Sequence, residues 1–590
     1  MTTDTARIPG WKKAWLILTP AQRRSAAALF VLLVIGMFLE MLGVGMVVPA
    51  LAFMAADDPN RISPRVGRYL ALIGSPTRDQ LVIGGVVVLF VVAAVKSAFL
   101  LYVAWRQTLL SASIHSSLGQ RLYTLYLTQP WTFHLQRNSA QLIRNTAFES
   151  GLFTSVVTSF LVICTDTLVM AGIAAMLLVV QPVGAIVAGG ILGASIVVLQ
   201  KLTKPAVTRW GAARQHHELK KLQQLQQGLG GAKDVKILGR EARFIEQFEV
   251  HNAMHAHVNQ RQILVQQVPR LWYEFVAVAG LCLLSVTMVV LGTSVSRFVP
   301  TLGLFAAAAF KLLPSVNRLA LNMQTVWYSA PVVNTLYAEL QLPASPVPHE
   351  RASRLPFERA VEFSHVSFRY ATATSDAIHD VCLRIPRGQS VGFIGESGAG
   401  KSTLVDVLLG LLQPTTGRVS VDGIDISTNP RGWQRLIGYV PQSIYLSDDT
   451  LRRNIAFGIP DEEIDDDAVS RSLRAAKLDD FVAGLPEGTN TFVGERGIRM
   501  SGGQRQRVGI ARALYHDPTV LVLDEATSAL DTDTERGVMD AVNELHGEKT
   551  LVIVAHRLTT VAQCDHIYRL HKGQVVDSGT FPEVTAAAST

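Results

Sequence analysis

One stretch constrains the possible folds of this chain more than any other. It is residues 395–402, which read Gly-Glu-Ser-Gly-Ala-Gly-Lys-Ser. They follow a short apolar run, residues 390–394, that predicts a buried strand, and they precede residues 403–409, whose pattern predicts a helix. A glycine-rich turn at a helix N-terminus lets backbone N–H groups converge on phosphate oxygens. The spacing therefore predicts a phosphate-binding loop in an α/β domain, with a plain surface loop as the alternative.

The side chains of this loop suggest how a bound nucleotide would be held. Lys401 is long enough to reach the β- and γ-phosphates, and Ser402 offers a hydroxyl to Mg²⁺. The pattern predicts ATP and Mg²⁺ as ligands. The nucleotide contacts expected from the loop are Gly395, Glu396, Ser397, Gly398, Ala399, Gly400, Lys401, Ser402 and Thr403.

A second motif stands at residues 520–525, which read Val-Leu-Val-Leu-Asp-Glu. Four apolar residues followed by two carboxylates fit a buried strand that ends at a nucleotide, a Walker B pattern. Asp524 is then the expected Mg²⁺ ligand, and Glu525 the group that polarises the attacking water. An ordinary strand end is the alternative, and the phosphate loop earlier in the chain favours the nucleotide interpretation.

The first half of the chain differs sharply from this soluble part. Only 17% of the 590 residues are charged, and the long apolar runs are concentrated in residues 1–335. We expect a basic leader at 1–25, a transmembrane domain at 26–335, a linker at 336–358 and a nucleotide-binding domain at 359–590. Runs long enough for a roughly 30 Å hydrocarbon core predict six spans. They lie at about 26–56, 81–105, 150–180, 183–200, 268–293 and 301–331.

Charge distribution predicts the orientation. Six spans put both ends of the chain on one side of the membrane. Two long basic regions, 106–148 and 201–265, fall on that side too, so the positive-inside rule makes it cytoplasmic. Lipid headgroups explain the net charge of +7 better than nucleic acid does, and no nucleic-acid partner is expected. The four cysteines, far apart in the sequence, show no metal or pairing pattern.

A further motif stands at residues 501–504, which read Ser-Gly-Gly-Gln. They resemble the signature motif of ATP-binding cassette (ABC) proteins, with Met500 standing where leucine is usual. Further positions resemble the family's other motifs in the expected order, across residues 359–590. These positions are the adenine-stacking Tyr370, the Q-loop Gln442, the D-loop Asp531 and the switch His556.

The resemblance implies a type IV ABC exporter built as a half-transporter. Its fold would be an α-helical six-span transmembrane domain plus a P-loop domain with a RecA-like core and antiparallel β and α-helical subdomains. Two copies would clamp ATP between the loop of one and Ser501, Gly502, Gly503 and Gln504 of the other, so the partner is a second copy. The catalytic residues would be Glu525, His556, Gln442 and Lys401. The Mg²⁺ ligands would be Ser402, Gln442 and Asp524. A purely structural His556 is the alternative.

The membrane half resembles lipid-linked oligosaccharide flippases of bacteria, on residues 126–131, 234–241 and 309–315. That resemblance implies an ATPase in the inner membrane that moves an amphipathic, anionic lipid-linked glycan. Exporters of other lipids, peptides or drugs share the architecture, and an ATP-gated channel-type ABC protein is a different class. Residues 129–134 and 230–236 are the expected coupling helices.

Charged residues inside the spans are candidates for cargo contact, because such charges tend to face a bundle interior or a cavity. Glu40, Lys311 and Arg318 are the candidate substrate residues. Ion pairing inside the bundle is the alternative.

Overall fold

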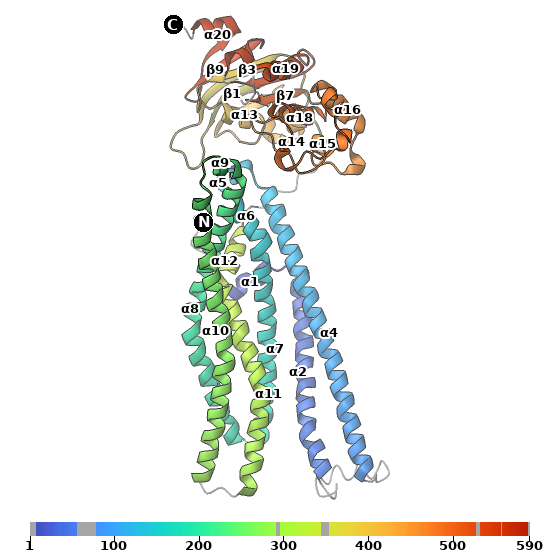
Figure 1. Cartoon of the computed structure of the whole chain (residues 1–590), viewed down its shortest axis with the longest axis vertical. Helices are drawn as coiled ribbons and strands as arrows, with labels where there is room; N and C mark the ends of the chain where they lie inside the picture. The colour runs from blue at the N-terminus through green and yellow to red at the C-terminus, as the bar shows by residue number, and fades with distance from the viewer. Residues whose placement is uncertain are drawn as a thin grey trace. The chain divides into compact units, whose positions relative to one another are not determined.

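The computed structural model describes residues 8–55, 78–180, 182–290, 295–343, 353–526, 532–555 and 557–587. It forms two compact units, coloured along the chain in Figure 1. One unit comprises Met1–Gln129 and Gln136–Ser345, and the other Pro130–Leu135 and Pro346–Thr590. We call the first the helical unit and the second the cassette.

The described part of the helical unit consists mainly of long helices. Helices α8 and α10 pack along each other, as do α7 and α11, and α2 and α4 (Figure 1). Leu199 of α8, Tyr273 of α10 and Val316 of α11 are buried in a shared apolar core. The elements are α1 (Gly10–Ile17), α2 (Pro20–Ala55), α4 (Arg78–Leu127), α6 (Ser139–Arg144), the π-helical turn η3 (Asn145–Glu149), α7 (Ser150–Val180), α8 (Pro182–Gly230), α9 (Ala232–Ile237), α10 (Glu241–Val290), α11 (Val295–Tyr328) and α12 (Ala330–Glu339).

Within the described residues, five helical stretches are long and apolar enough to cross a membrane. They are Pro20–Leu42, Ile83–Leu127, Ser139–Ala175, Ala185–Gly230 and Glu241–Thr287. Large apolar side chains such as Phe90 and Leu101 are 72% exposed, which suits contact with lipid. The sixth expected span, 301–331, falls on α11, where the side chains of residues 295–308, 310 and 311 lie outside the described part.

Helix α2 begins at Pro20, earlier than the start of the expected first span at residue 26. Proline suits the first helical position, and Thr19 and Gln22 cap the turn. The Gln22 side chain accepts from Thr19 N–H at 3.0 Å, and Gln22 N–H donates to Thr19 Oγ1 at 3.3 Å. This reciprocal capping starts the helix inside the basic leader.

A buried ionic cluster joins η3 to α8 in the helical unit. Glu149 is fully buried and accepts from Arg214 at 3.1 Å and from Gln215 at 3.2 Å. Arg144 lies 3.4 Å from the same carboxylate, and Arg214 also contacts Glu218 at 2.5 Å. A buried charge without a partner is costly, so this cluster fixes how the two helices meet.

The cassette is built on two sheets. The strands of the larger sheet run in the order β10-β9-β3-β8-β7-β6, with β9, β3, β8, β7 and β6 mutually parallel. The smaller, antiparallel sheet has the order β2-β1-β4-β5. The strands are β1 (Ala360–Phe368), β2 (Ile378–Pro386), β3 (Ser390–Gly395), β4 (Thr416–Val421), β5 (Ile424–Asp425), β6 (Ile437–Val440), β7 (Val520–Asp524), β8 (Thr550–Val554), β9 (His566–His571) and β10 (Gln574–Gly579).

Helices surround these sheets and form a separate helical subdomain between β6 and α18. The helices are α5 (Trp131–Gln136), α13 (Lys401–Leu408), α14 (Pro430–Gln434), α15 (Leu451–Ile455), α16 (Asp466–Ala475), α17 (Asp479–Ala483), α18 (Gly502–Leu514), α19 (Thr532–Asn543) and α20 (Phe581–Ala587), with 3₁₀ turns η4 (Ile426–Thr428), η5 (Asp461–Glu463), η6 (Gly488–Asn490), η7 (Glu495–Gly497) and η8 (Leu558–Val561). The fold is thus an α/β core with antiparallel β and α-helical subdomains, as the sequence predicts.

Two apolar cores hold the cassette together. One lies between the two sheets and includes Phe363, Phe393 and Trp433. The other packs α18 and the helical subdomain against the larger sheet through Leu473, Val508 and Leu523. Strand β3 is buried along most of its length, as expected for a parallel strand covered on both faces. This packing fixes the ends of β3 and β7, which lead into the candidate site.

Candidate nucleotide-binding site

The loop between β3 and α13 has the backbone that only glycine adopts easily. Gly395 has φ of 150° and Gly400 has φ of 101°. A Cβ atom added to Gly395 would lie 2.3 Å from the carbonyl oxygen of Leu570, and one on Gly400 would lie 2.7 Å from that of Ala377. Both glycines are therefore required for the loop to close. Glu396, Ser397 and Gly398 between them are exposed.

Lys401 is the first residue of α13 and its side chain folds back over the loop. Its Nζ donates to the carbonyl oxygens of Gly395 at 2.8 Å and Glu396 at 3.0 Å. Burial lowers the pKa of the Lys401 amine, and the Glu525 and Asp524 carboxylates oppose that effect. The cation thus lies in the field of both Walker B carboxylates, where a phosphate group would find it.

The residues after Lys401 link the loop to the smaller sheet. Ser402 is exposed at the start of α13, and the hydroxyl of Thr403 lies 3.1 Å from that of Tyr370. Tyr370 follows β1 and meets Phe368 edge to face, with ring centroids 5.0 Å apart. These contacts orient the half-buried Tyr370 ring beside the loop.

Strand β7 ends at the two carboxylates. Asp524 is buried, and among the described residues its Oδ1 atom has no hydrogen-bond partner. Burial, reinforced by the Glu525 carboxylate, raises the pKa of Asp524. A buried carboxylate oxygen without a partner, facing a phosphate loop, is the arrangement expected of a ligand for a divalent cation.

Glu525 is held beside Asp524 by an unusual backbone conformation. Its φ is 49°, and its N–H donates to Val554 O at 3.0 Å. Gln442, exposed just after β6, donates through Nε2 to Glu525 Oε2 at 2.6 Å. Strained non-glycine residues cluster at functional sites. The structure therefore places the Gln442 amide against the Glu525 carboxylate.

The signature residues begin α18. Ser501 caps the helix, and a reciprocal pair of hydrogen bonds with Gln504 closes a capping box. The first helical residues, Gly502 and Gly503, have N–H groups with no intrahelical acceptor. In the described part of the chain, the side-chain hydrogen bonds of Ser501 and Gln504 join only each other, so they do not meet the phosphate loop of the same chain.

The predicted D-loop and switch residues lie outside the described part. Asp531 and His556 are two such positions. Of the candidate cargo residues, Lys311 has its side chain outside it as well. The other two are ion-paired within the helical unit: Glu40 lies 3.0 Å from Lys96, and Arg318 lies 2.6 Å from Asp166.

Two residues that the sequence analysis did not assign also belong to the site. Tyr439 of β6 donates its hydroxyl to Asp524 Oδ2 at 3.4 Å. Asp406 of α13 is coupled electrostatically to Asp524, and the Trp131 side chain hydrogen-bonds to it. Ser402 and Asp406 are four apart, so helical spacing alone places both on one face of α13. The contact with Trp131 joins segments far apart in sequence.

Known proteins resemble this chain in sequence and fold. A family model described as ABC transporter matches residues 378–528. The ATP-dependent lipid A-core flippase of Cupriavidus pinatubonensis is 30% identical over 512 residues, 86% of this chain and 85% of that protein. A mitochondrial potassium channel ATP-binding subunit of Xenopus tropicalis is 43% identical over 242 residues, 40% of this chain and 35% of that protein. A bacterial Atm1-family ABC exporter with ATP bound has a TM-score of 0.77 at 21% identity, with 96% of each chain covered.

This chain belongs to the ABC transporter family, as an exporter-type half-transporter. It is a multi-pass membrane protein whose cassette binds ATP and couples ATP hydrolysis to transport.

Proposed function

We propose that two copies of this chain form an ATP-driven flippase for an amphipathic lipid with an anionic glycan headgroup. The protein would work in the bacterial inner membrane with its cassettes on the cytoplasmic side. The carrying observation is the long alignment with a lipid A-core flippase, which covers 86% of this chain and therefore extends through the membrane helices. A lipid-linked oligosaccharide shares this headgroup chemistry and is our proposed cargo.

Hydrolysis would use the residues that the loop and β7 bring together. Lys401 would turn from the loop carbonyls to the β- and γ-phosphates, and the loop N–H groups would hold the remaining oxygens. Glu525 would take the proton of the attacking water, while Gln442 holds that carboxylate in place. His556 would stabilise the γ-phosphate, and Tyr370 would stack on adenine.

Magnesium fits the donors that the structure provides. The unpartnered Oδ1 of Asp524, the exposed hydroxyl of Ser402 and the amide of Gln442 are oxygen donors of the kind that Mg²⁺ accepts. The ion would neutralise charge on the phosphates when bound.

The second copy would complete the site. Because Ser501 and Gln504 hydrogen-bond to each other, the N-terminus of α18 is already ordered to receive an anion. We propose that Gly502 and Gly503 of one chain close over ATP held by the other chain, with Asp531 at the contact. ATP binding then holds the cassettes together, and hydrolysis releases them.

In the helical unit, we propose that Arg318 and Lys311 recognise the anionic headgroup, and that Glu40 tunes the site. The Arg318 side chain is 55% exposed although it is paired with the buried Asp166. Such a pair keeps a cation at a fixed place while leaving donors for a ligand. The interior pairing of Glu40 with Lys96 would balance this positive charge.

Other exporter cargoes and a gated channel are the competing functions. The relative named as a channel subunit aligns with only 40% of this chain, so its likeness does not reach most of the membrane helices. The Gln442–Glu525 contact supports active hydrolysis and thus a pump. Transport that requires hydrolysis separates a pump from a gate.

Reconstitution into liposomes tests the proposal. We expect a polyprenyl diphosphate glycan or lipid A to stimulate ATP hydrolysis and to cross the bilayer, measured by headgroup access to an impermeant reagent. Phosphatidylcholine is the control lipid, and a cationic drug is the control cargo. Stimulation by the drug alone, or equal lipid movement in Glu525→Gln, would contradict the proposal.

A double substitution sharpens the test of Arg318. Arg318→Gln with Asp166→Asn removes both charges, so no buried carboxylate is left unpaired. We expect this variant to need more anionic lipid for half-maximal stimulation. Arg270→Gln, which removes an exposed pair with Glu274 on α10, is the matched control and should respond normally. Unchanged lipid dependence in the double variant would exclude Arg318 from headgroup recognition.

A further inference from the structure

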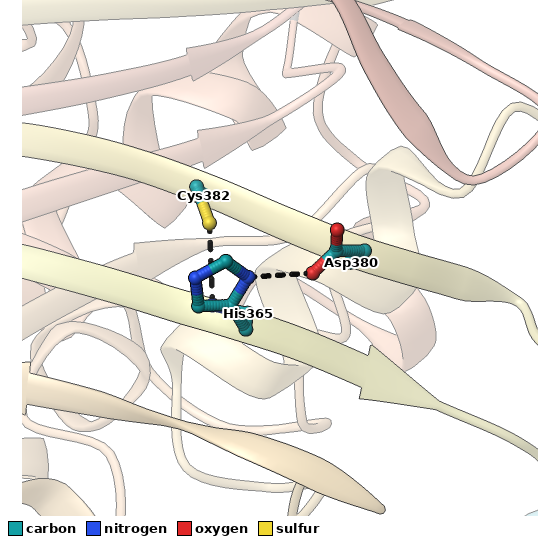
Figure 2. Close-up of side chains that lie close together, drawn as sticks. All are labelled: His365, Asp380 and Cys382. Carbon is teal, nitrogen blue, oxygen red and sulfur yellow. Dashed lines mark hydrogen bonds and ion pairs between the residues drawn. The ribbon is translucent and has the colours of Figure 1, made fainter.

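Three side chains on the solvent face of the smaller sheet lie close enough to share one metal ion. His365 comes from β1, and Asp380 and Cys382 come from β2 (Figure 2). One donor atom from each lies within 4.8 Å of the others. The His365 Nδ1 atom is 2.8 Å from Asp380 Oδ1, and the His365 N–H donates to Cys382 Sγ at 3.3 Å.

Two irregularities in the strand pairing bring these donors together. Between Phe363 and Val366, β1 advances three residues while β2 advances two. Between Val366 and Phe368, β1 advances two residues while β2 advances three. The first irregularity contains His365 and the second contains Asp380. Bulges of this kind re-aim a side chain and are over-represented beside functional sites.

The backbone at these two positions is strained. His365 has φ of 52° and Asp380 has φ of 49°. A left-handed conformation costs a non-glycine residue energy, and such residues persist where the surroundings or a function maintain them. Here both strained residues face each other across neighbouring strands and both carry a metal-binding group.

The donor set selects the class of ion. One sulfur, one imidazole nitrogen and one carboxylate oxygen suit Zn²⁺ and similar borderline metals, whereas Mg²⁺ and Ca²⁺ prefer oxygen ligands alone. We infer that His365, Asp380 and Cys382 form a zinc-class metal site on the antiparallel subdomain of the cassette. Three protein ligands leave a fourth position for water or another ligand, because the His365 and Asp380 side chains are 78% and 58% exposed.

Such an ion would fasten the two strands that support the nucleotide site. Tyr370 follows β1 five residues after His365. Ala377, three residues before Asp380, places its carbonyl oxygen where a Cβ on Gly400 would lie 2.7 Å away. An ion bridging β1 and β2 would thus restrain both the adenine-side tyrosine and the strand beside the phosphate loop.

Metal titration of the full chain in detergent tests this site. We expect one Co²⁺ ion per chain to produce a near-ultraviolet thiolate-to-metal absorption band, and Zn²⁺ to displace it. Cys382→Ser should abolish the band, and His365→Ala or Asp380→Asn, which each remove one of the three ligands, should raise the Co²⁺ concentration at half-saturation. Zn²⁺ should also protect Cys382 from a water-soluble thiol reagent.

Controls separate this site from other metal-binding groups. His379→Ala removes a neighbouring exposed histidine that pairs with Asp376, and its titration should match that of the unaltered chain. The His217–His251 pair between α8 and α10 contains no sulfur, so an ion bound there gives no thiolate band. ATP binding by each variant checks its fold. A missing band in the unaltered chain, or one that survives Cys382→Ser, would overturn the inference.

Discussion

The hydroxyl of Tyr439 connects the strand that precedes Gln442 to the carboxylate proposed for Mg²⁺. It donates to Asp524 Oδ2 at 3.4 Å, and Oδ1 has no partner among the described residues. This hydrogen bond favours the ionised carboxylate and lowers the pKa of Asp524, against the larger upward effects of burial and of Glu525. Tyr439 therefore orients the Asp524 carboxylate and favours its ionised form.

Tyr439→Phe should weaken Mg²⁺ binding, so that ATP hydrolysis needs a higher Mg²⁺ concentration. Without the hydroxyl, the pKa of Asp524 rises further and the carboxylate loses one restraint. A hydrogen bond of about 1 kcal/mol corresponds to about a fivefold higher Mg²⁺ concentration at half-maximal rate. A Mg²⁺ titration at neutral pH measures it, and raising the pH should partly restore the variant. Tyr445→Phe, which alters an exposed tyrosine, is the control; identical titrations for both would refute a positioning role.

These residues show what local sequence can and cannot predict. The phosphate loop is predictable because its strand, glycines and Lys401 are contiguous, and the structure has the expected strand–turn–helix. Tyr439 reaches Asp524 only because β6 pairs with β7, two strands about 80 residues apart in sequence. Likewise, Arg318 and Asp166 are each visible as charges in apolar helices, but their pairing depends on how α11 packs on α7. Contacts across the fold carry no local pattern.

The short helix α5 belongs to the same compact unit as the cassette. Its Trp131 side chain hydrogen-bonds to Asp406 on α13, the helix that begins at Lys401. Burial and then the Asp524 carboxylate raise the pKa of Asp406 to about 6. A segment from between two membrane helices thus contacts the helix that starts at the phosphate loop, which supports the coupling role expected for residues 129–134.

The raised pKa of Asp406 predicts a pH dependence of cassette stability with a definite sign. The folded cassette binds this proton more tightly than the unfolded chain does. The associated stability is present below about pH 4, is lost as pH rises through about 6, and changes no further above that. Asp406→Asn should remove this fall, so that its unfolding midpoint varies less than that of the unaltered chain between pH 5 and 7.

Thermal unfolding of the full chain in detergent at several pH values measures the effect. The variant Trp131→Phe gives a second test of it. Because the Trp131 hydrogen bond lowers the pKa of Asp406, its loss should extend the fall in stability to higher pH. Asp540→Asn, an exposed carboxylate on α19, is the control. If Asp406→Asn and the unaltered chain show the same pH profile, Asp406 does not titrate in this range.

Secondary structure was more predictable than the joints between elements. Helix α7 ends at Val180 and α8 begins at Pro182, and proline suits the first residue of a helix. No local sequence pattern predicts the π-helical turn Asn145–Glu149 or the two bulges of β1 and β2. Each depends on partners elsewhere in the fold, such as Arg214 for Glu149.

One chain carries one phosphate loop and one signature, and the signature residues do not hydrogen-bond to that loop. If each signature serves the loop of the other copy, two inactive chains can restore one site between them. One chain carries Lys401→Ala and keeps its signature; the other carries Gly502→Asp and keeps its loop. In a Glu525→Gln background that slows hydrolysis, we expect purified heterodimers to retain one occluded ATP, and each homodimer to retain none.

The reciprocal pairing gives the opposite result and makes the test decisive. In the second heterodimer, both substitutions lie in one chain and its partner carries only Glu525→Gln. If each site is shared between copies, one site then has a defective phosphate loop and the other has a defective signature. A site completed within one chain would instead remain whole in the unaltered partner. We therefore expect no occluded ATP from this second heterodimer, counted with radiolabelled nucleotide after rapid gel filtration. One ATP here and none in the first heterodimer would show that a single copy encloses its own nucleotide, and the proposed clamping of two cassettes would have to be abandoned.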